Sequence, residues 1–306
     1  MKMDPKVSVI IPLFNARQYV RGAIDSVLSQ TYRNIEIIVV DDGSTDNPEI
    51  VLEKYSDRIK FIRLEENKGP SIARNIGIRT STGEYLVFLD ADDYVSTEKI
   101  EMEIEVLEKH PETGWVYESS LTFDEDGRVF RELPQKFLQP NEDPPQGKIF
   151  HRLILRNLMV VNAVMIKRGV LDVGTFDESL RGFEDWDLWL RVSAKYEVKY
   201  IDKALAFVRV HPDSSQRNVI RFWSDKLRVI DKISRLYPSL TDPYRNEIIK
   251  VLAEAYYYVG LGYYHKDEFR ESASQFLKAI WAYPFQRRVY FDLTLAILKF
   301  LRIPVQ

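Results

Sequence analysis

The chain has 306 residues, of which 45% are hydrophobic and 29% charged, and its formal net charge is −3. This composition is typical of a globular protein with one large domain or one large and one smaller domain, and it excludes the disordered and fibrous classes. The chain has 43 basic and 46 acidic residues, so duplex nucleic acid is not expected as the main partner. The absence of cysteine excludes disulfides, thiolate metal sites and cysteine nucleophiles.

The sequence shows neither a secretory signal nor an apolar run long enough to span a bilayer. We therefore expect a cytoplasmic protein. Residues 293–303 are apolar except for Thr294, Lys299 and Arg302. This stretch is too short to cross a membrane but suits a peripheral contact with its cytoplasmic face.

The first third of the chain alternates between strand and helix patterns. Apolar runs rich in β-branched residues predict strands at 7–11, 35–40, 59–64 and 85–89, with helical spacing between them. This alternation predicts an α/β fold with right-handed βαβ units and a mainly parallel, Rossmann-like sheet. Because these strands are apolar almost throughout, we expect helices on both faces of the sheet.

The middle of the chain mixes further strands with a polar loop. We expect a helix that ends before Pro111, strands at 114–123, 160–166 and 199–210, a helix at 184–195, and a Pro-rich surface loop at 133–148. Strand and helix patterns resume after the loop, so it does not read as a domain linker. We place the first domain at residues 1–215.

From about residue 219 the pattern is helical only, and we place an all-helical region at 216–306. Residues 255–284 resemble one tetratricopeptide unit, with matches at Tyr256, Val259, Gly260, Tyr263, Phe269, Phe276, Ala279 and Pro284. One such unit cannot bury its own faces, so we expect these helices to pack on the first domain or on a second subunit. They either stabilise the core or form a docking surface.

Acidic residues follow two of the predicted strands, as DDGS at 41–44 and DADD at 90–93. Ligands bind outside the carboxyl ends of parallel strands, so we expect both segments to face one crevice, although each alone also reads as a turn. In extended chain Asp90 and Asp92 point the same way, which favours a cation between them. Without thiolates or a paired-histidine motif, Mg²⁺ or Mn²⁺ is favoured over zinc.

The chain lacks a P-loop, a dinucleotide fingerprint and a nucleophile elbow. A basic residue would then help to neutralise phosphate, and Arg74 is the candidate unless it is a solvated helix-face arginine. A third acidic segment, GFEDWD at 182–187, opens a helix. It serves either as a helix cap or as a general base, with Trp186 and Trp189 as walls that exclude water.

These segments together resemble one family. VSVIIPLFN at 7–15, VDDGSTD at 40–46, ARN at 73–75, LDADD at 89–93 and EDWD at 184–187 occur in the order seen in family 2 inverting glycosyltransferases. The chain looks like a member of that family, with its GT-A fold, over roughly residues 5–215. The resemblance implies a nucleotide-sugar half at about 5–132 and an acceptor half at about 149–215.

The family likeness implies a nucleoside-diphospho-sugar donor, with UDP the expected nucleotide. The implied donor-site residues are Pro12, Leu13 and Asn15 for the nucleoside, Asp42 with Asp41 for the base or ribose, Arg74 for the base and diphosphate, and Asp90 for the ribose or sugar. A single displacement at the anomeric carbon inverts the configuration and needs one base and a stabilised leaving group.

The same likeness implies the remaining roles. Asp92 would bind Mn²⁺ or Mg²⁺, with His211 as a second ligand, and Asp185 would be the general base beside Glu184. The expected reaction is hexosyl transfer to a glycan or lipid-linked acceptor in polysaccharide biosynthesis, with homo-oligomerisation through the C-terminal helices as an option.

Two other functions remain open. A sugar nucleotidyltransferase would share the sheet, but it typically needs a glycine-rich and basic loop, whereas residues 12–15 read PLFN. A catalytically inactive transferase core with a helical docking surface would act as a scaffold, although all of the candidate carboxylates are present. The reactions that the protein catalyses separate the three functions.

Overall fold

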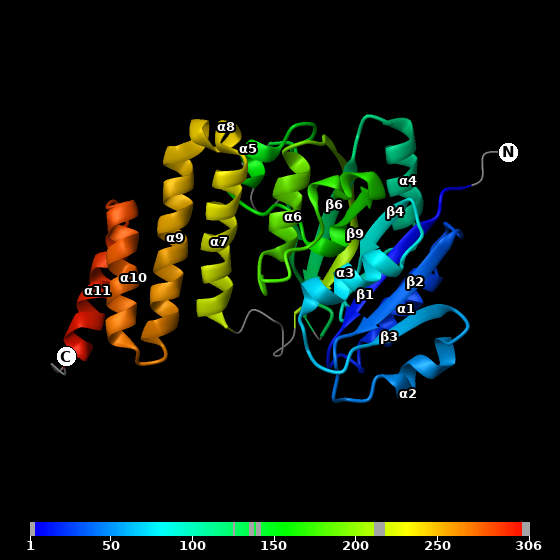
Figure 1. Ribbon diagram of the computed structural model, residues 1–306, viewed down its shortest axis with the longest axis horizontal. Coiled ribbons are helices and arrows are strands. Elements are labelled where there is room, and N and C mark those ends of the chain that lie inside the picture. Colours follow the sequence, from blue (N-terminus) through cyan, green and yellow to red (C-terminus); the bar gives the residue numbers. More distant parts are fainter. Residues whose placement is uncertain (1–3, 125, 135–137, 139–141, 211–217, 302–306) are drawn as a thin grey trace. The chain divides into compact units, whose positions relative to one another are not determined.

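The computed structural model describes residues 4–124, 126–134, 138, 142–210 and 218–301 (Figure 1). The chain divides into two compact units. The first comprises Met1–Ile149, Asn157–Ser179 and Arg191–Pro212, and the second comprises Phe150–Arg156, Leu180–Leu190 and Asp213–Gln306. The sequence-based boundary between residues 215 and 216 stays a prediction.

The described part of the first unit is built on a nine-stranded sheet of order β3-β2-β1-β4-β8-β6-β9-β5, with β7 paired to β6. The strands are β1 (Val7–Leu13), β2 (Ile35–Asp41), β3 (Ile59–Arg63), β4 (Tyr85–Phe88), β5 (Tyr94–Val95), β6 (Trp115–Phe123), β7 (Val129–Leu133), β8 (Val164–Lys167) and β9 (Val198–Arg209).

The N-terminal half of the sheet is parallel. Strand β1 pairs in parallel with β2 and β4, and β2 with β3, which confirms the predicted Rossmann-like core. The other half is mixed, because β8 runs antiparallel to both β4 and β6, β5 antiparallel to β9, and β6 parallel to β9. The carboxyl ends of β1, β2 and β4 therefore meet at one edge of the sheet.

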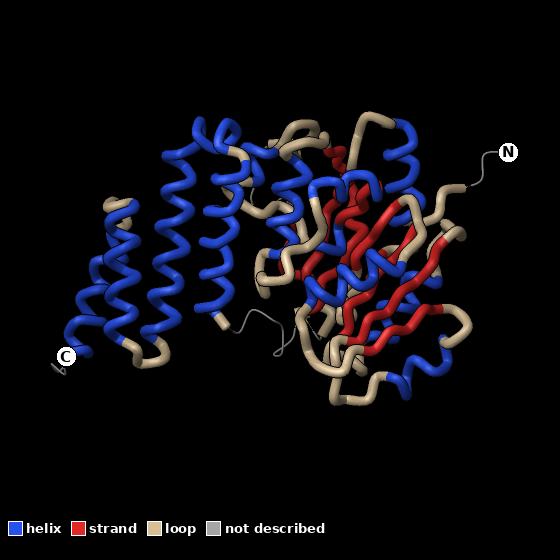
Figure 2. The backbone as a smooth tube through the Cα atoms, viewed as in Figure 1, coloured by secondary structure: helices blue, strands red, loops and turns tan. Residues whose placement is uncertain are grey.

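Helices cover both faces of the parallel half (Figure 2). Val7, Val9 and Ile11 belong to a core cluster with α1, whereas Ile10 faces α3. A Cβ on Gly77 of α3 would lie only 2.3 Å from Ile10 Cγ2, so glycine lets this helix approach the sheet closely. The helices of this unit are α1 (Val20–Leu28), α2 (Glu49–Leu52), α3 (Pro70–Thr80) and α4 (Lys99–Lys109).

The second unit is helical in its described residues, which confirms the predicted helical C-terminal region. Helices α7, α9, α10 and α11 pack in succession. Gly260 allows this packing, since a Cβ there would lie 2.6 Å from Phe276 Cε1. The helices are α5 (Phe150–Leu153), α6 (Glu184–Ser193, which ends in the first unit), α7 (Val219–Leu236), α8 (Pro238–Thr241), α9 (Arg245–Tyr264), α10 (Phe269–Ala282) and α11 (Arg287–Phe300).

None of the helices in the described ranges has both the length and the apolar character that a bilayer span requires. The tetratricopeptide-like unit at 255–284 covers the end of α9 and all of α10, and its assignment to that repeat class stays a prediction.

Candidate functional site

The loops after β1 and β2 are joined by side-chain hydrogen bonds. Asn15 takes a left-handed conformation (φ 48°), which asparagine tolerates better than most residues. Its Oδ1 accepts from the Thr45 N–H at 2.8 Å, and its own N–H donates to Ser44 Oγ at 2.9 Å. Pro12 lies half-buried in β1 just before this loop. The first predicted nucleoside-binding segment is therefore held against the second.

Asp41, which ends β2, and Asp42, which follows it, are both buried. Asp41 Oδ1 accepts from the Ser44 N–H at 3.0 Å, and its Oδ2 lies 3.5 Å from Arg63 Nε. The Asp42 N–H donates to the Leu13 carbonyl at 2.7 Å, which extends the pairing of β1 and β2. Leu13 itself is buried, so it offers its backbone rather than its side chain to this edge.

Asp42 also ties β2 to the start of α3. Its two carboxylate oxygens accept the backbone N–H groups of Lys68 (2.7 Å) and Gly69 (2.6 Å). The turn that follows Asp42 needs glycine at position 43. Gly43 has φ +71°, and a Cβ there would lie 2.6 Å from the Glu66 carbonyl carbon. Asp42 thus has a structural role, because it holds the start of α3 against the end of β2.

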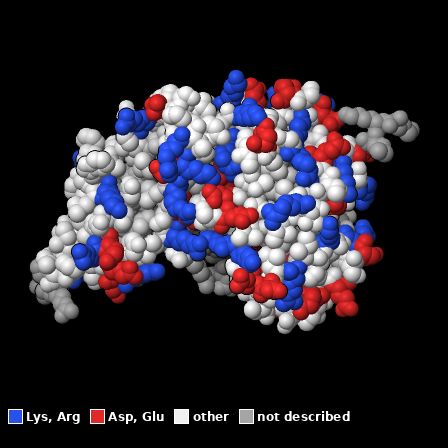
Figure 3. Space-filling model, viewed as in Figure 1, with Lys and Arg blue, Asp and Glu red and all other residues white. Residues whose placement is uncertain are grey.

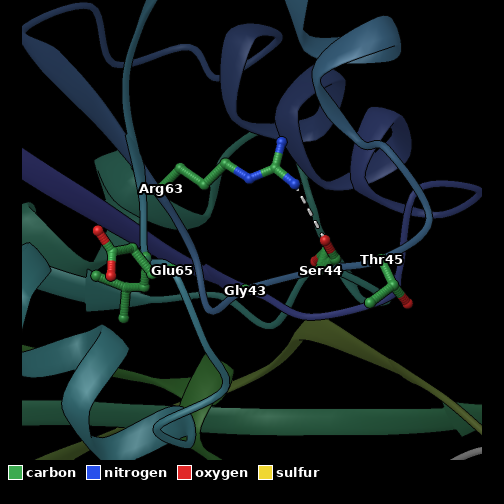
Figure 4. Close-up of a pocket in the computed structure, with 6 residues that line it drawn as sticks. Gly43, Ser44, Thr45, Arg63 and Glu65 are labelled. Atoms are coloured by element: carbon green, nitrogen blue, oxygen red, sulfur yellow. Dashed lines mark hydrogen bonds between the residues drawn. The ribbon is translucent and has the colours of Figure 1, made fainter.

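A cavity of about 370 Å³ opens beside this turn, at the carboxyl ends of β2 and β3 (Figure 4). Arg63 reaches across it and donates from Nη2 to the Ser44 carbonyl at 3.2 Å. Arg63 also pairs with Glu49 at 2.9 Å. The cavity is lined by Gly43, Ser44, Thr45, Arg63, Leu64 and Glu65.

Arg74 pairs with the first aspartate after β4. Its Nη2 donates to Asp90 Oδ1 at 2.6 Å, and its guanidinium lies 5.4 Å from the centre of the Phe176 ring. The Arg74 side chain is only 4% exposed, whereas that of Asp90 is 35% exposed. Arg74 is therefore not a solvated helix-face arginine, and that alternative is wrong. The buried Arg74 guanidinium therefore holds a carboxylate that is partly exposed to solvent.

The segment DADD divides into half-buried and buried carboxylates. Asp93 is buried and accepts from Asn162 Nδ2 (3.0 Å) and from the Arg209 N–H (2.8 Å). Burial, with the carboxylates of Asp92 and Asp90, raises the pKa of Asp93 well above its usual range. The Arg209 side chain donates from Nε to the Asp92 carbonyl at 3.1 Å. Asp93 thus anchors the loop, and Asp90 and Asp92 stay half-buried.

The oxygen donors of this loop suit a hard divalent cation. Asp90 and Asp92 are half-buried carboxylates, and Mn²⁺ and Mg²⁺ prefer oxygen ligands while keeping open positions for water or phosphate. Across the described ranges, no three or more histidine or acidic side chains are grouped as a complete metal-binding set. His211, the second predicted ligand, lies outside the described residues.

The acidic helix start belongs to the second unit. Glu184 and Asp185 are half-buried in the first turn of α6, and Asp185 Oδ1 accepts from the Trp186 N–H at 2.6 Å. Asp187 is fully buried and lies 2.8 Å from Lys232 Nζ. Asp187 is thus engaged in an ion pair, which leaves Glu184 and Asp185 as the accessible carboxylates of this segment.

The tryptophans of α6 are core residues. Trp186 and Trp189 are fully buried, and Trp186 Nε1 donates to the Leu153 carbonyl at 2.7 Å. They cannot form an exposed wall, so that part of the sequence interpretation is wrong. The half-buried aromatic residue beside the carboxylates is Phe183, whose φ is +58° and whose ring centre lies 4.3 Å from that of Phe222.

Sequence reasoning missed two residues that hold the site together. Asn75 donates from Nδ2 to the Phe176 carbonyl (2.9 Å) and to Glu178 (3.0 Å), and its Oδ1 accepts from the Phe176 N–H at 3.1 Å. Asn75 belongs to the ARN segment at 73–75, which the sequence comparison with the family had already picked out, although without this role. Arg209, at the end of β9, had no comparable signal, because its contacts to the DADD loop are distant in sequence.

A sheet with a parallel half and acidic residues at its strand ends is the arrangement expected of the GT-A fold. The sequence model of the family "Glycosyl transferase family 2" matches residues 8–162. A protein of Rickettsia typhi, named as an uncharacterized glycosyltransferase, is 34% identical over 239 residues, which cover 75% of this chain and 74% of that protein. The chain belongs to glycosyltransferase family 2.

Other relatives are longer than the matched region. A Rickettsia felis protein, also named as an uncharacterized glycosyltransferase, is 34% identical over 211 residues, which cover 68% of this chain but only 33% of that protein. The matched part of the chain thus spans about a third of that relative's length.

Solved structures support the same fold. Residues 1–349 of Staphylococcus aureus TarS, in complex with UDP-GlcNAc, match with a TM-score of 0.63 and 19% identity over 91% of this chain and 89% of that one. A mannosyltransferase from Pyrobaculum calidifontis, in complex with GDP-Man and Mn²⁺, matches with a TM-score of 0.62 and 17% identity over 97% of this chain and 81% of that one.

Proposed function

We propose that the protein is a metal-dependent inverting glycosyltransferase. It moves a hexose from a nucleoside-diphospho-sugar, with UDP the expected nucleotide, to a hydroxyl group of a glycan or lipid-linked acceptor. The observation that carries this proposal is that Asn15, Asp42 and Asp90 follow β1, β2 and β4 at one edge of the sheet, each held by a hydrogen bond to a neighbouring segment. The UDP-GlcNAc and GDP-Man complexes of the two structural neighbours support a nucleotide-sugar donor.

The loops after β1 and β2 are suited to bind the nucleoside. Asp42 would accept from a base or ribose group, and Asp41 and Pro12 lie in the adjoining strand ends of β2 and β1. The Asn15–Thr45 hydrogen bond fixes the loops before a ligand arrives, so little conformational entropy is lost on binding. The partly exposed carboxylate of Asp90 would accept from a ribose or sugar hydroxyl group.

The positive charge of Arg74 sits beneath the DADD loop. Asp90 is oriented by the guanidinium and cannot turn away without breaking a hydrogen bond of 2.6 Å. Asp92, with His211 as a second candidate, would hold Mn²⁺ or Mg²⁺. When bound, such a cation supplies charge that stabilises the departing diphosphate.

Asp185 is the proposed general base. It accepts the acceptor's hydroxyl proton as that oxygen bonds to the anomeric carbon, while the bond from this carbon to the diphosphate breaks and the configuration inverts. Its hydrogen bond from the Trp186 N–H supports a fixed orientation, and the engagement of Asp187 with Lys232 leaves Glu184 as the neighbouring alternative.

The purified protein should release a nucleoside diphosphate from one of a panel of nucleotide sugars, in a reaction that needs Mn²⁺ or Mg²⁺ and stops with EDTA. Release of pyrophosphate from a nucleoside triphosphate and a sugar phosphate would instead identify a nucleotidyltransferase. Absence of turnover with every donor, together with specific retention of a protein partner, would identify a scaffold. We expect the reaction to take place in the cytoplasm, at the inner surface of the membrane.

A further inference from the structure

Exposed apolar side chains gather on the last two described helices. Of the fifteen large apolar side chains that are exposed in the described residues, eight lie between residues 277 and 301. Trp281 on α10 is 90% exposed, and Phe285 in the α10–α11 connection is 77% exposed. Apolar side chains scattered singly need no explanation, but a concentration of this kind marks an interaction surface.

Helix α11 carries exposed apolar residues next to the side that packs in the second unit. Its inner side, with Val289 and Ala296 fully buried, packs in the core of the second unit. Exposed Tyr290 and Ile297 each follow one of these buried residues, so they form an apolar stripe beside the inner side, whereas Arg288, Asp292 and Lys299 form a polar stripe on its other flank. The exposed apolar stripe is suited to an apolar environment.

Basic residues accompany these apolar ones. Residues 277–301 contain Lys278, Arg287, Arg288 and Lys299 but a single acidic residue, Asp292. The Asp292 side chain is only 15% exposed and accepts from Tyr257 Oη at 2.8 Å. This surface is therefore basic although the whole chain has a net charge of −3. Figure 3 shows broad uncharged areas at the left of the view, interrupted by separate basic side chains and by one group of acidic side chains.

We propose that the α10–α11 surface, meaning the exposed side chains of residues 277–301, docks on the headgroup region of an anionic phospholipid bilayer. Exposed Trp and Phe side chains suit the interface between lipid tails and water, and lysine and arginine attract anionic headgroups. A second copy of the chain fits less well, because the two surfaces of a two-fold interface would carry the same excess of basic residues and repel each other.

Vesicle sedimentation tests this assignment without using enzymatic activity. The whole protein is mixed with vesicles of phosphatidylcholine alone or of equal parts of phosphatidylcholine and phosphatidylglycerol. We expect it to sediment with the anionic vesicles and to be released by salt. Lys278→Glu with Arg287→Glu should weaken this binding by at least about tenfold, and Trp281→Ser with Phe285→Ser by a similar factor.

Exposed positions of the first unit supply the matched controls. Ile50→Ser and Arg58→Glu change an apolar and a basic exposed residue and should leave vesicle binding unchanged. Circular dichroism and the melting temperature verify that each variant is folded. The proposal is overturned if the protein binds neither kind of vesicle or binds both equally. It is also overturned if lipid binding is absent and Trp281→Ser with Phe285→Ser abolishes a dimer, because the surface would then join two copies of the chain.

Discussion

At the scale of single residues, the two partners of the Arg74–Asp90 ion pair differ in burial, and this difference separates their roles. The guanidinium is almost completely buried, while the carboxylate is a third exposed. A buried arginine loses hydration, and here Asp90 and the Phe176 ring compensate for it. Lysine could not replace it without loss, because its point charge lacks the planar fork that holds a carboxylate in one orientation.

The two aspartates of α6 should respond differently to the same substitution. Asp185→Asn is expected to lower turnover by about 10²–10⁴-fold with little change in stability, because it removes a proton acceptor that is not in the core. Asp187→Asn is its matched control and should reduce the free energy of unfolding by about 1–3 kcal/mol, since it weakens a buried ion pair with Lys232.

Steady-state kinetics and urea unfolding of both variants check this prediction. Near-normal turnover of Asp185→Asn would move the base to Glu184. An unfolding free energy of Asp187→Asn equal to that of the unmodified protein would contradict the structural role given to that residue.

At the scale of elements, Asn75 fastens α3 to the segment 176–178 with three hydrogen bonds. Asn75→Ala is expected to cost about 2–3 kcal/mol of unfolding free energy, because buried backbone groups of Phe176 lose their partners. Glu178→Ala removes only one of these bonds and should cost less than about 1 kcal/mol. Chemical denaturation compares the two variants, and equal losses would show that the asparagine does not hold this segment.

A buried charge cluster joins α4 to β6. Lys99 donates to Glu103 at 2.6 Å and also to Glu118, and all three side chains are inaccessible to solvent. Two carboxylates thus share one ammonium group. Burial raises the pKa of Glu103 well above its ordinary value of 4.5, and Glu118 adds to this effect while Lys99 opposes it. Burial likewise raises the pKa of Glu118, against the effect of Lys99.

This cluster predicts how stability depends on pH. A carboxyl group with a raised pKa keeps its proton longer in the folded than in the unfolded protein, so its contribution to stability is lost as the pH rises above 4.5 towards the folded-state pKa. Glu103→Gln removes one such group and should flatten this decline. Urea unfolding at several pH values measures the free energy of unfolding of both proteins. If this free energy falls equally steeply with pH in the variant and in the unmodified protein, the prediction is wrong.

The elements themselves were largely predictable, and their arrangement was predictable only in part. Runs of apolar β-branched residues indicated β1 to β4, because such runs are required where both faces of a sheet are covered. The two-residue strand β5 has no periodicity to detect. The mixed directions of β6, β8 and β9 depend on pairing between distant segments, which an apolar run does not encode.

At the scale of the whole molecule, the candidate donor site was predictable where it lies at strand ends. Parallel strands bring Asp41, Asp42, Asp90 and Asp92 to one sheet edge, and their sequence positions were sufficient to infer this. The supporting contacts were not, since Asn162 and Arg209 reach Asp93 from 69 and 116 residues away. Their partners are specified by the folded sheet rather than by local spacing.

The central claim is that this sheet edge binds a nucleoside diphosphate together with a divalent cation. The most direct measurement is the melting temperature with UDP or GDP, in the presence of Mn²⁺ or of EDTA. We predict a rise of roughly 5 °C at a hundredfold excess over Kd, lost with EDTA and in Asp92→Asn but kept in Asp185→Asn. No rise with any nucleoside diphosphate and Mn²⁺, or an equal rise in Asp92→Asn, would contradict the account.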